Sequence, residues 1–244
     1  QQTDRLTAEL SSAAAYMTSI MPRSLHGAVG VSSCYLPARE LGGDCFDYSW
    51  IDGDHLLIYL IDVSGHGVEP ALLAVSVHNL LRSGSLPADT VLSPDKILLQ
   101  LNHLFQMDRQ SDHYFTMWCG VYQPSTRTFH YASAGAPAAL AFNVEARKSV
   151  AVTELSTPSL PIGVLEETEF SAGSYQVPPG CTILVYSDGA SELDLPGGGQ
   201  LSTAAFKGLV TRLAGTSDWT LDSLVHELLA LTRTAVFEDD CSLI

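Results

Sequence analysis

A long series of strand patterns in the middle of the chain constrains the fold most. Between Tyr114 and Asp188 we predict strands over 114–123, 127–134, 138–143, 149–155, 168–176 and 181–187. Two strand segments precede them, 28–36 and 44–63, and the second contains a turn at Asp52-Gly53. The strands outnumber what a βαβ repeat supplies, so the pattern favours largely antiparallel sheets.

Helix patterns occur before and after these strands. We expect helices over 4–21, from about Pro70 to Ser83, from Ser93 to Asp108, near 202–214 and over 220–236. Pro70 suits the first turn of a helix, and Thr220 is a good N-cap. The combined pattern predicts an α+β fold, an antiparallel β-sandwich of two sheets flanked by helices in α-β-β-α order.

Composition narrows the functional classes. The chain has 244 residues, 46% hydrophobic and 16% charged, enough apolar material for a sizeable core. The net charge of −15 argues against nucleic acid as a partner, because phosphate binding requires clustered Lys and Arg. No apolar run reaches the roughly 18 residues that a membrane span needs, and the N-terminus lacks a signal-peptide core. We expect a cytoplasmic protein without membrane contact, whose five cysteines, lacking any C-x-x-C pair, are free thiols.

Acidic residues stand at four places where a predicted strand meets a glycine-rich or polar turn. These residues are Asp44, Asp62, Asp188 and the pair Asp239-Asp240. An unpaired Asp at the end of an apolar strand is costly to bury, so four of them need a common explanation. Mg²⁺ and Mn²⁺ prefer carboxylate oxygens, and the neighbouring glycines let the backbone approach an ion closely. The pattern therefore predicts a divalent metal site.

Each of these aspartates also has a purely structural interpretation. Asp188 alone is compatible with a turn, Asp62 alone with a helix cap, and Asp239-Asp240 with a solvated terminus. The joint occurrence of all four places in an apolar framework favours the metal site over coincidence.

The same segments resemble the motifs of a known family. The chain is similar to bacterial phosphatases of the PPM superfamily (type 2C), in the SpoIIE-like branch of stress and sporulation signalling. The matching segments are 37–47 (PARELGGDCFD), 62–67 (DVSGHG), 186–192 (YSDGASE) and 238–243 (EDDCSL). There are two departures. The branch usually has Ala-Gly-His where this chain has Ala134-Gly135-Ala136, and Thr where it has Ser242.

The resemblance implies a two-metal centre with Mn²⁺ or Mg²⁺. Asp62 is expected to touch both ions, with the Val63 carbonyl joining one of them. Asp44 completes the first site mainly through waters, whereas Asp188 and Asp239 hold the second. Two metals activate a water that attacks phosphorus directly, so no Cys or Ser nucleophile is required.

Several residues near these motifs keep more than one interpretation. Asp240 is the alternate last ligand, because the register within an Asp pair cannot be read from one sequence. Arg39 either grips the substrate phosphate or is a surface residue. His66 either protonates the leaving alkoxide or sits in a tight turn. We expect Asp47 to be structural, together with His26, His55, His78, His103, His113, His130 and His226.

These observations predict a serine/threonine protein phosphatase that acts on a phosphorylated regulatory protein. A non-catalytic phosphatase-fold binding module and a small-molecule phosphohydrolase are the alternatives. We divide the chain into an N-terminal helix, 1–25, as a signalling linker, and a phosphatase domain, 26–244. The resemblance implies an upstream sensory or receiver domain. A helical stripe suggests a homodimer seam or packing against the domain itself, through Leu6, Leu10, Ala13, Met17 and Ile20.

Overall fold

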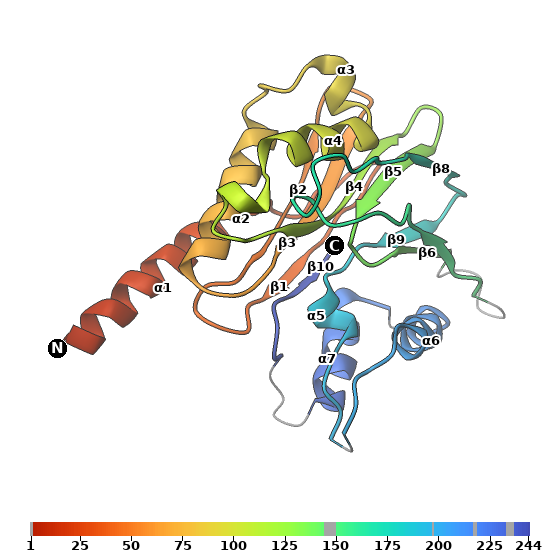
Figure 1. The fold of residues 1–244 in the computed structure, drawn as a ribbon. Helices are drawn as coiled ribbons and strands as arrows, with labels where there is room; N and C mark the ends of the chain where they lie inside the picture. The colour runs from red at the N-terminus through yellow and green to blue at the C-terminus, as the bar shows by residue number, and fades with distance from the viewer. Residues whose placement is uncertain (1, 144–149, 197, 217–218, 233–236) are drawn as a thin grey trace.

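Two layers of antiparallel β-sheet, stacked between two layers of helices, form the molecule (Figure 1). The computed structural model describes residues 2–143, 150–196, 198–216, 219–232 and 237–244, with the backbone alone for residues 2–4 and 6. This arrangement confirms the predicted α-β-β-α sandwich. In the part of the chain described, no helix is long and apolar enough to cross a membrane.

The first sheet has five strands and carries the centre of the fold. Its strands in spatial order are β2 (Asp44–Trp50), β3 (Leu56–Val63), β4 (Phe115–Gln123), β5 (Thr128–Ala134) and β8 (Gly173–Gln176). Every neighbouring pair runs antiparallel. The continuous apolar run of β3 follows from its central place, because a strand covered on both faces has no side to expose to water.

The second layer consists of a three-stranded sheet and a two-stranded sheet that meet. The first is ordered β7 (Thr153–Leu155), β6 (Ala139–Asn143) and β9 (Cys181–Leu184), and the second pairs β1 (Cys34–Leu36) with β10 (Cys241–Leu243). Val185 and Ile244 exchange two backbone hydrogen bonds of 2.9 Å, which join the chain after β9 to the end of β10. This junction brings the chain's last residues beside the segment that contains Asp188.

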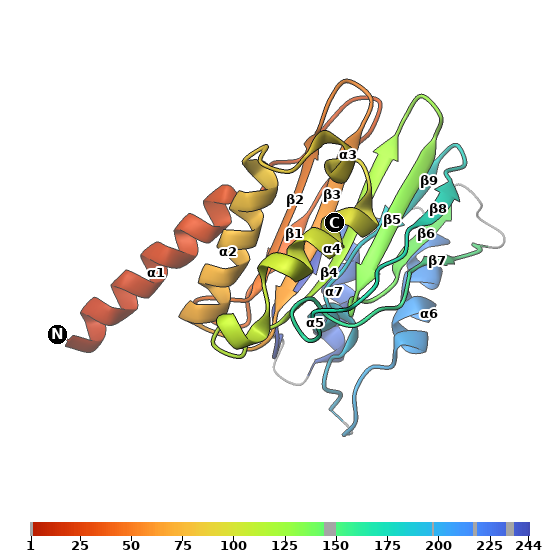
Figure 2. The same ribbon diagram turned by 45° about the horizontal axis from the view of Figure 1, so that its top comes forward.

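The helices cover the outer faces of the two sheets (Figures 1 and 2). On the first sheet lie α2 (Val68–Arg82), α3 (Ala88–Val91), α4 (Pro94–Leu104) and a 3₁₀ turn (Met107–Arg109). On the second lie α5 (Asp188–Ser191), α6 (Thr203–Ala214) and α7 (Leu221–Leu231). Three apolar clusters result, one under each helical layer and one between the sheets.

Every predicted strand segment contains a strand, but the strand ends were placed less accurately, and β10 was not predicted. Only 34–36 of the predicted strand 28–36 is a strand, and 173–176 of the predicted 168–176. The short helices α3 and α5 were not predicted, because four residues carry too little periodicity. Part of the predicted strand 149–155 and of the predicted helix 220–236 lies outside the described residues.

The N-terminal helix α1 (Gln2–Ile20) projects from the body, and its packing against the core begins at Leu10 (Figures 1 and 2). Met17 is buried in the cluster under α2, and Leu10 and Ala14 pack partly against it. Ala13 is exposed and Ile20 half-buried, while the side chain of Leu6 lies outside the described residues. The stripe is therefore used by the domain itself at Met17 and Leu10.

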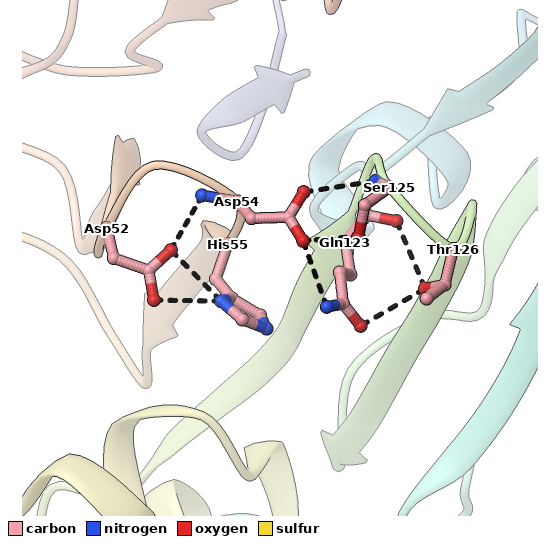
Figure 3. A network of polar contacts seen from close by, with 6 residues as sticks. All are labelled: Asp52, Asp54, His55, Gln123, Ser125 and Thr126. Carbon is pink, nitrogen blue, oxygen red and sulfur yellow. Dashed lines mark hydrogen bonds and ion pairs between the residues drawn. The ribbon is translucent and has the colours of Figure 1, made fainter.

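At the hairpin end of the first sheet, a polar network ties two turns together (Figure 3). Asp52 accepts hydrogen bonds from the Asp54 backbone and from the His55 ring, at 2.7 and 2.9 Å. Asp54 in turn accepts from the Gln123 amide and the Ser125 backbone, both at 3.0 Å. The β2–β3 turn is thereby fastened to the β4–β5 turn.

Candidate metal centre

The register of β2 and β3 places two of the predicted carboxylates directly opposite each other. Asp44 pairs with Asp62 across the antiparallel ladder. Because side chains alternate between the faces of a strand, Asp44 shares a face with Phe46, and Asp62 shares a face with Leu60. Phe46 and Leu60 belong to the cluster between the two sheets, so both carboxylates lie on the inner face of the sandwich.

The second layer brings the remaining acidic residues to this point. Asp188 begins α5 immediately after Ser187, whose hydroxyl donates to the Asp240 carbonyl at 3.1 Å. The Ser242 backbone N–H donates to the Ser187 hydroxyl at 3.0 Å, and the Ser187 N–H donates to the Ser242 carbonyl at 3.1 Å. These bonds fix Asp188 beside Asp239 and Asp240, although about fifty residues separate the segments.

Glycines permit the close approach of these segments. A Cβ at Gly42 would lie 1.9 Å from Oδ2 of Asp240, and one at Gly189 would lie 2.2 Å from the Asp240 carbonyl oxygen. A Cβ at Gly43 would lie 2.4 Å from the Val63 carbonyl oxygen. Since no side chain fits at these distances, the glycines of the motifs are required by packing around the carboxylates.

The Asp44 carboxylate is buried, and only 1% of the residue is exposed. Within the part of the chain that the structure describes, neither of its carboxylate oxygens has a hydrogen-bond partner. Burial raises the pKa of Asp44 well above its usual value, and the charges of Asp62 and Asp240 raise it further. The Ser187 and Ser242 hydroxyls oppose this rise, but neither has hydrogen-bond geometry to Asp44. An orphaned buried carboxylate of this kind requires a proton or a cation.

Asp62 and Asp188 have the same imbalance. Burial raises the pKa of Asp62 well above its usual value, and Asp188 and Asp239 add to the rise by charge repulsion. Burial raises the pKa of Asp188 to about 6, with further contributions from Asp239 and Glu192. Acidic groups with too few cationic neighbours favour binding of a divalent ion over remaining ionised alone.

The two members of the Asp pair have different environments. Asp240 is buried, and its carboxylate accepts the backbone N–H groups of Ala38 at 2.9 Å and Gly43 at 2.7 Å. Asp239 is exposed at the cavity and accepts one hydrogen bond, from the Asp240 backbone at 2.8 Å. The Asp240 carboxylate thus already binds the backbone of segment 37–47, whereas the Asp239 carboxylate can still accept further contacts.

A cavity of about 290 Å³ opens over these carboxylates. Its walls include Asp62, Asp188 and Asp239, together with Arg39 and His66. Sequence reasoning missed its other polar wall residues, Ser64, Tyr114, Thr116 and Glu238. Thr116 was detectable in principle, because it lies beside Asp62 on the next strand of the ladder.

The donor set fits hard divalent cations, since it consists of carboxylate and carbonyl oxygens with one orphaned carboxylate at Asp44. In the described residues, no three His, Cys, Asp or Glu side chains are already spaced as a closed metal site. A larger cavity of about 450 Å³ lies elsewhere between the sheets, with Tyr122, Arg127 and Phe129 among its walls. Among the described residues, its walls contain no Asp or Glu side chain, whereas Asp62, Asp188 and Asp239 line the smaller cavity.

Asp47 lies apart from this centre. It stands three positions after Asp44 on β2, so its side chain faces the opposite side of the sheet, toward α2. There it forms an ion pair with Arg82 at 3.5 Å, and burial raises its pKa, opposed by the charge of Arg82. This placement agrees with the structural role expected for Asp47.

Comparison with known proteins assigns the chain to a family. The model of stage II sporulation protein E (SpoIIE) matches residues 52–244. The chain belongs to the SpoIIE family. Phosphoserine phosphatase RsbP of Bacillus subtilis is 31% identical over 168 residues, which cover 67% of this chain and 40% of that relative. The chain thus spans less than half of the length of this SpoIIE-family relative.

Solved structures show that the SpoIIE-family sandwich described above is a PP2C-type fold. The SiaA-PP2C domain of Pseudomonas aeruginosa superimposes with a TM-score of 0.79 at 17% identity, covering all of this chain and 97% of that one. RsbX in complex with magnesium has a TM-score of 0.58 at 14% identity, over 88% of this chain and 91% of that one. At these identities the comparison establishes the fold alone.

Proposed function

We propose that this domain is a metal-dependent serine/threonine protein phosphatase. The observation that carries the proposal is the cluster around Asp44, a buried carboxylate without a hydrogen-bond partner among the described residues. It lies opposite Asp62, which in turn interacts with the charges of Asp188 and Asp239. Membership of the SpoIIE family and the phosphoserine phosphatase named among its relatives support the same activity.

In this proposal two divalent ions, Mn²⁺ or Mg²⁺, occupy the carboxylate cluster. Asp44, Asp62 and the Val63 carbonyl would hold one ion, and Asp188 and Asp239 would hold the other together with Asp62. Asp62 would be the shared ligand, because it faces Asp44 across the ladder and lies within the electrostatic influence of Asp188 and Asp239. When bound, two such ions activate a water for in-line attack on phosphorus.

The protein's own side chains bind and orient the phosphate. Arg39 is exposed on the wall of the cavity, where its planar fork can bind two phosphate oxygens. Asp240 holds the backbone of Ala38 and Gly43, and thus positions Arg39 between them. His66 also borders the cavity, and we assign it to the turn after β3, without a proton-transfer step.

Hydrolysis of para-nitrophenyl phosphate tests the activity. We expect turnover with Mn²⁺, loss of turnover after chelation with EDTA, and recovery when Mn²⁺ or Mg²⁺ is added. Full activity after exhaustive chelation would contradict the two-metal proposal. Binding of a phosphoprotein without any hydrolysis would support the alternative of a binding module. Preference for nucleotides over phosphopeptides would support a small-molecule phosphohydrolase.

The proposed substrate is a phosphorylated regulatory protein, and the proposed setting is a signalling protein with an upstream sensory or receiver domain. We further propose a homodimer through α1, whose N-terminal part projects from the body (Figure 2). Ala13 is exposed on the predicted seam, and Ser12 is exposed beside it. Sedimentation should show that Ala13→Asp weakens dimerisation while Ser12→Asp does not. Equal masses for both variants and the wild type would contradict the dimer.

A further inference from the structure

The turn between β3 and α2 is a solvent-exposed part of the proposed centre. It follows Asp62 and Val63 directly, and Gly65 and His66 within it are exposed. Gly65 has a φ of 91°, a conformation that L side chains rarely adopt. A ligand carbonyl in such a turn needs external contacts to keep its orientation.

Those contacts converge on Ser64, the residue after Val63. The Ser64 N–H donates to the Tyr114 carbonyl at 2.9 Å, and the Tyr114 N–H donates to the Ser64 hydroxyl at 3.2 Å. The Ser64 carbonyl lies 2.8 Å from Nδ1 of His113. A carbonyl oxygen only accepts, so Nδ1 of His113 carries the proton and donates to it.

The other side of the His113 ring faces Glu69 in the first turn of α2. Nε2 lies 3.4 Å from a carboxylate oxygen of Glu69. The His113 side chain is 21% exposed, and its Cε1 atom would lie 3.6 Å from a Cβ added at Gly65. His113 therefore connects the Ser64 carbonyl to the start of α2, and its ring lies beside Gly65.

The peptide group with the Ser64 carbonyl and the peptide group with the Val63 carbonyl are adjacent and share the Ser64 Cα. Fixing the first group therefore also limits the rotation of the second. The Val63 carbonyl faces the Cα of Gly43, which belongs to segment 37–47. The Val63 N–H donates to the Gly43 carbonyl at 3.3 Å, which is a long hydrogen bond. The contacts of Ser64 thus supply orientation that the Val63–Gly43 pairing provides only weakly.

We infer that His113 is a positioning residue for the metal-binding turn, donating from Nδ1 to the Ser64 carbonyl so that Val63 and Asp62 keep their ligand orientation. This inference rests on the proposed two-metal function. Groups that orient ligands typically contribute about 10- to 100-fold to metal affinity. We expect the lower end of that range, because His113 acts through the backbone.

Two substitutions separate donation from the mere presence of a polar side chain. In His113→Asn the amide nitrogen can replace Nδ1, whereas in His113→Gln it replaces Nε2 and cannot reach Ser64 in the same way. We expect His113→Asn to bind Mn²⁺ with near wild-type affinity and His113→Gln to bind it about tenfold more weakly. His130, an exposed histidine on β5, provides the matched control, and His130→Gln should leave the affinity unchanged.

Mn²⁺ affinity is measured by electron paramagnetic resonance of the free ion, with thermal unfolding of each metal-free variant as the check on folding. A wild-type protein that binds no Mn²⁺ would refute the proposed function, and this inference with it. If the wild type binds Mn²⁺ but His113→Asn and His113→Gln have equal affinities, the inference alone is wrong. A loss with His130→Gln as large as with His113→Gln would also overturn it.

Discussion

The two ends of the β2–β3 hairpin carry the same residue type in opposite electrostatic conditions. At the turn, hydrogen bonds lower the pKa of Asp52 and of Asp54 below the usual value (Figure 3). At the far end, burial and charge repulsion raise the pKa of Asp44 and of Asp62. The two ends of this hairpin therefore differ: the turn holds two carboxylates with hydrogen bonds, and the far end holds two whose charges are not compensated.

The difference lies in where the partners come from. Asp52 and Asp54 obtain theirs from the chain itself, through the His55 ring, the Gln123 amide and Ser125. Asp44 has no hydrogen-bond partner among the described residues, and the charges of Asp62 and Asp240 repel it. A carboxylate whose hydrogen bonds are complete stabilises a fold, whereas one left without them in a buried position awaits a cation or a proton.

The largest effect should separate Asp62→Asn from Asp54→Asn. We expect Asp62→Asn to lower turnover by about a hundredfold or more, because it removes a group that organises charge stabilisation in the transition state. Its metal-free stability should equal or exceed that of the wild type, since one repelling carboxylate is gone. Asp54→Asn should keep full turnover and melt at a lower temperature. Phosphatase assays and thermal melts measure both, and equal turnover for the two variants would remove the contrast.

The Asp pair at the C-terminal motif offers the next contrast. Asp240→Ala should lower the free energy of unfolding by about 2 kcal/mol, because it leaves the buried N–H groups of Ala38 and Gly43 without acceptors. Asp239→Ala should fold normally and lose metal affinity. Urea unfolding and Mn²⁺ titration distinguish the two. If Asp240→Ala is as stable as the wild type yet binds no metal, Asp240 is the ligand instead.

A smaller effect is expected from Arg39, the positively charged residue on the wall of the cavity that contains Asp62. Arg39→Ala should lower kcat/KM by about tenfold, equivalent to about 1.4 kcal/mol, because the phosphate loses a charged contact. Arg39→Lys should recover part of this loss, since it restores the charge without the planar fork. Steady-state kinetics with a phosphopeptide give the values. Unchanged kinetics for Arg39→Ala would make it a surface residue.

The smallest effect is the pH dependence of the metal-free protein. The folded state keeps protons on Asp188 up to about pH 6, whereas an unfolded Asp releases them near 3.8. Stability from this group is therefore present below the unfolded value and is lost as pH rises through about 6. The melting temperature without metal should fall over this interval, and saturating Mn²⁺ should remove the fall. A melting temperature that rises with pH there would contradict the raised pKa.

The sequence was sufficient to predict the sandwich and the acidic strand ends, because both depend on local patterns. Asp44 and Asp62 were recognisable from the glycines and apolar strand beside them. Asp240 was not separable from Asp239, because its distinguishing contacts come from Ala38 and Gly43, some two hundred residues away. His113 carried no local signal either. It was expected to be structural, and the atoms it contacts become its neighbours only in the folded chain.

The cross-strand pairing of Asp44 with Asp62 also restricts which insertions and deletions the hairpin can tolerate. The two residues meet because each lies at the same distance along its strand from the Trp50–Leu56 pair that precedes the turn at 51–55. Lengthening that turn keeps the ladder aligned, whereas deleting one residue from a single strand slips the register and sends one carboxylate to the other face. Length variation among functional descendants of this sequence should therefore collect at the hairpin tip and be absent from the two strands.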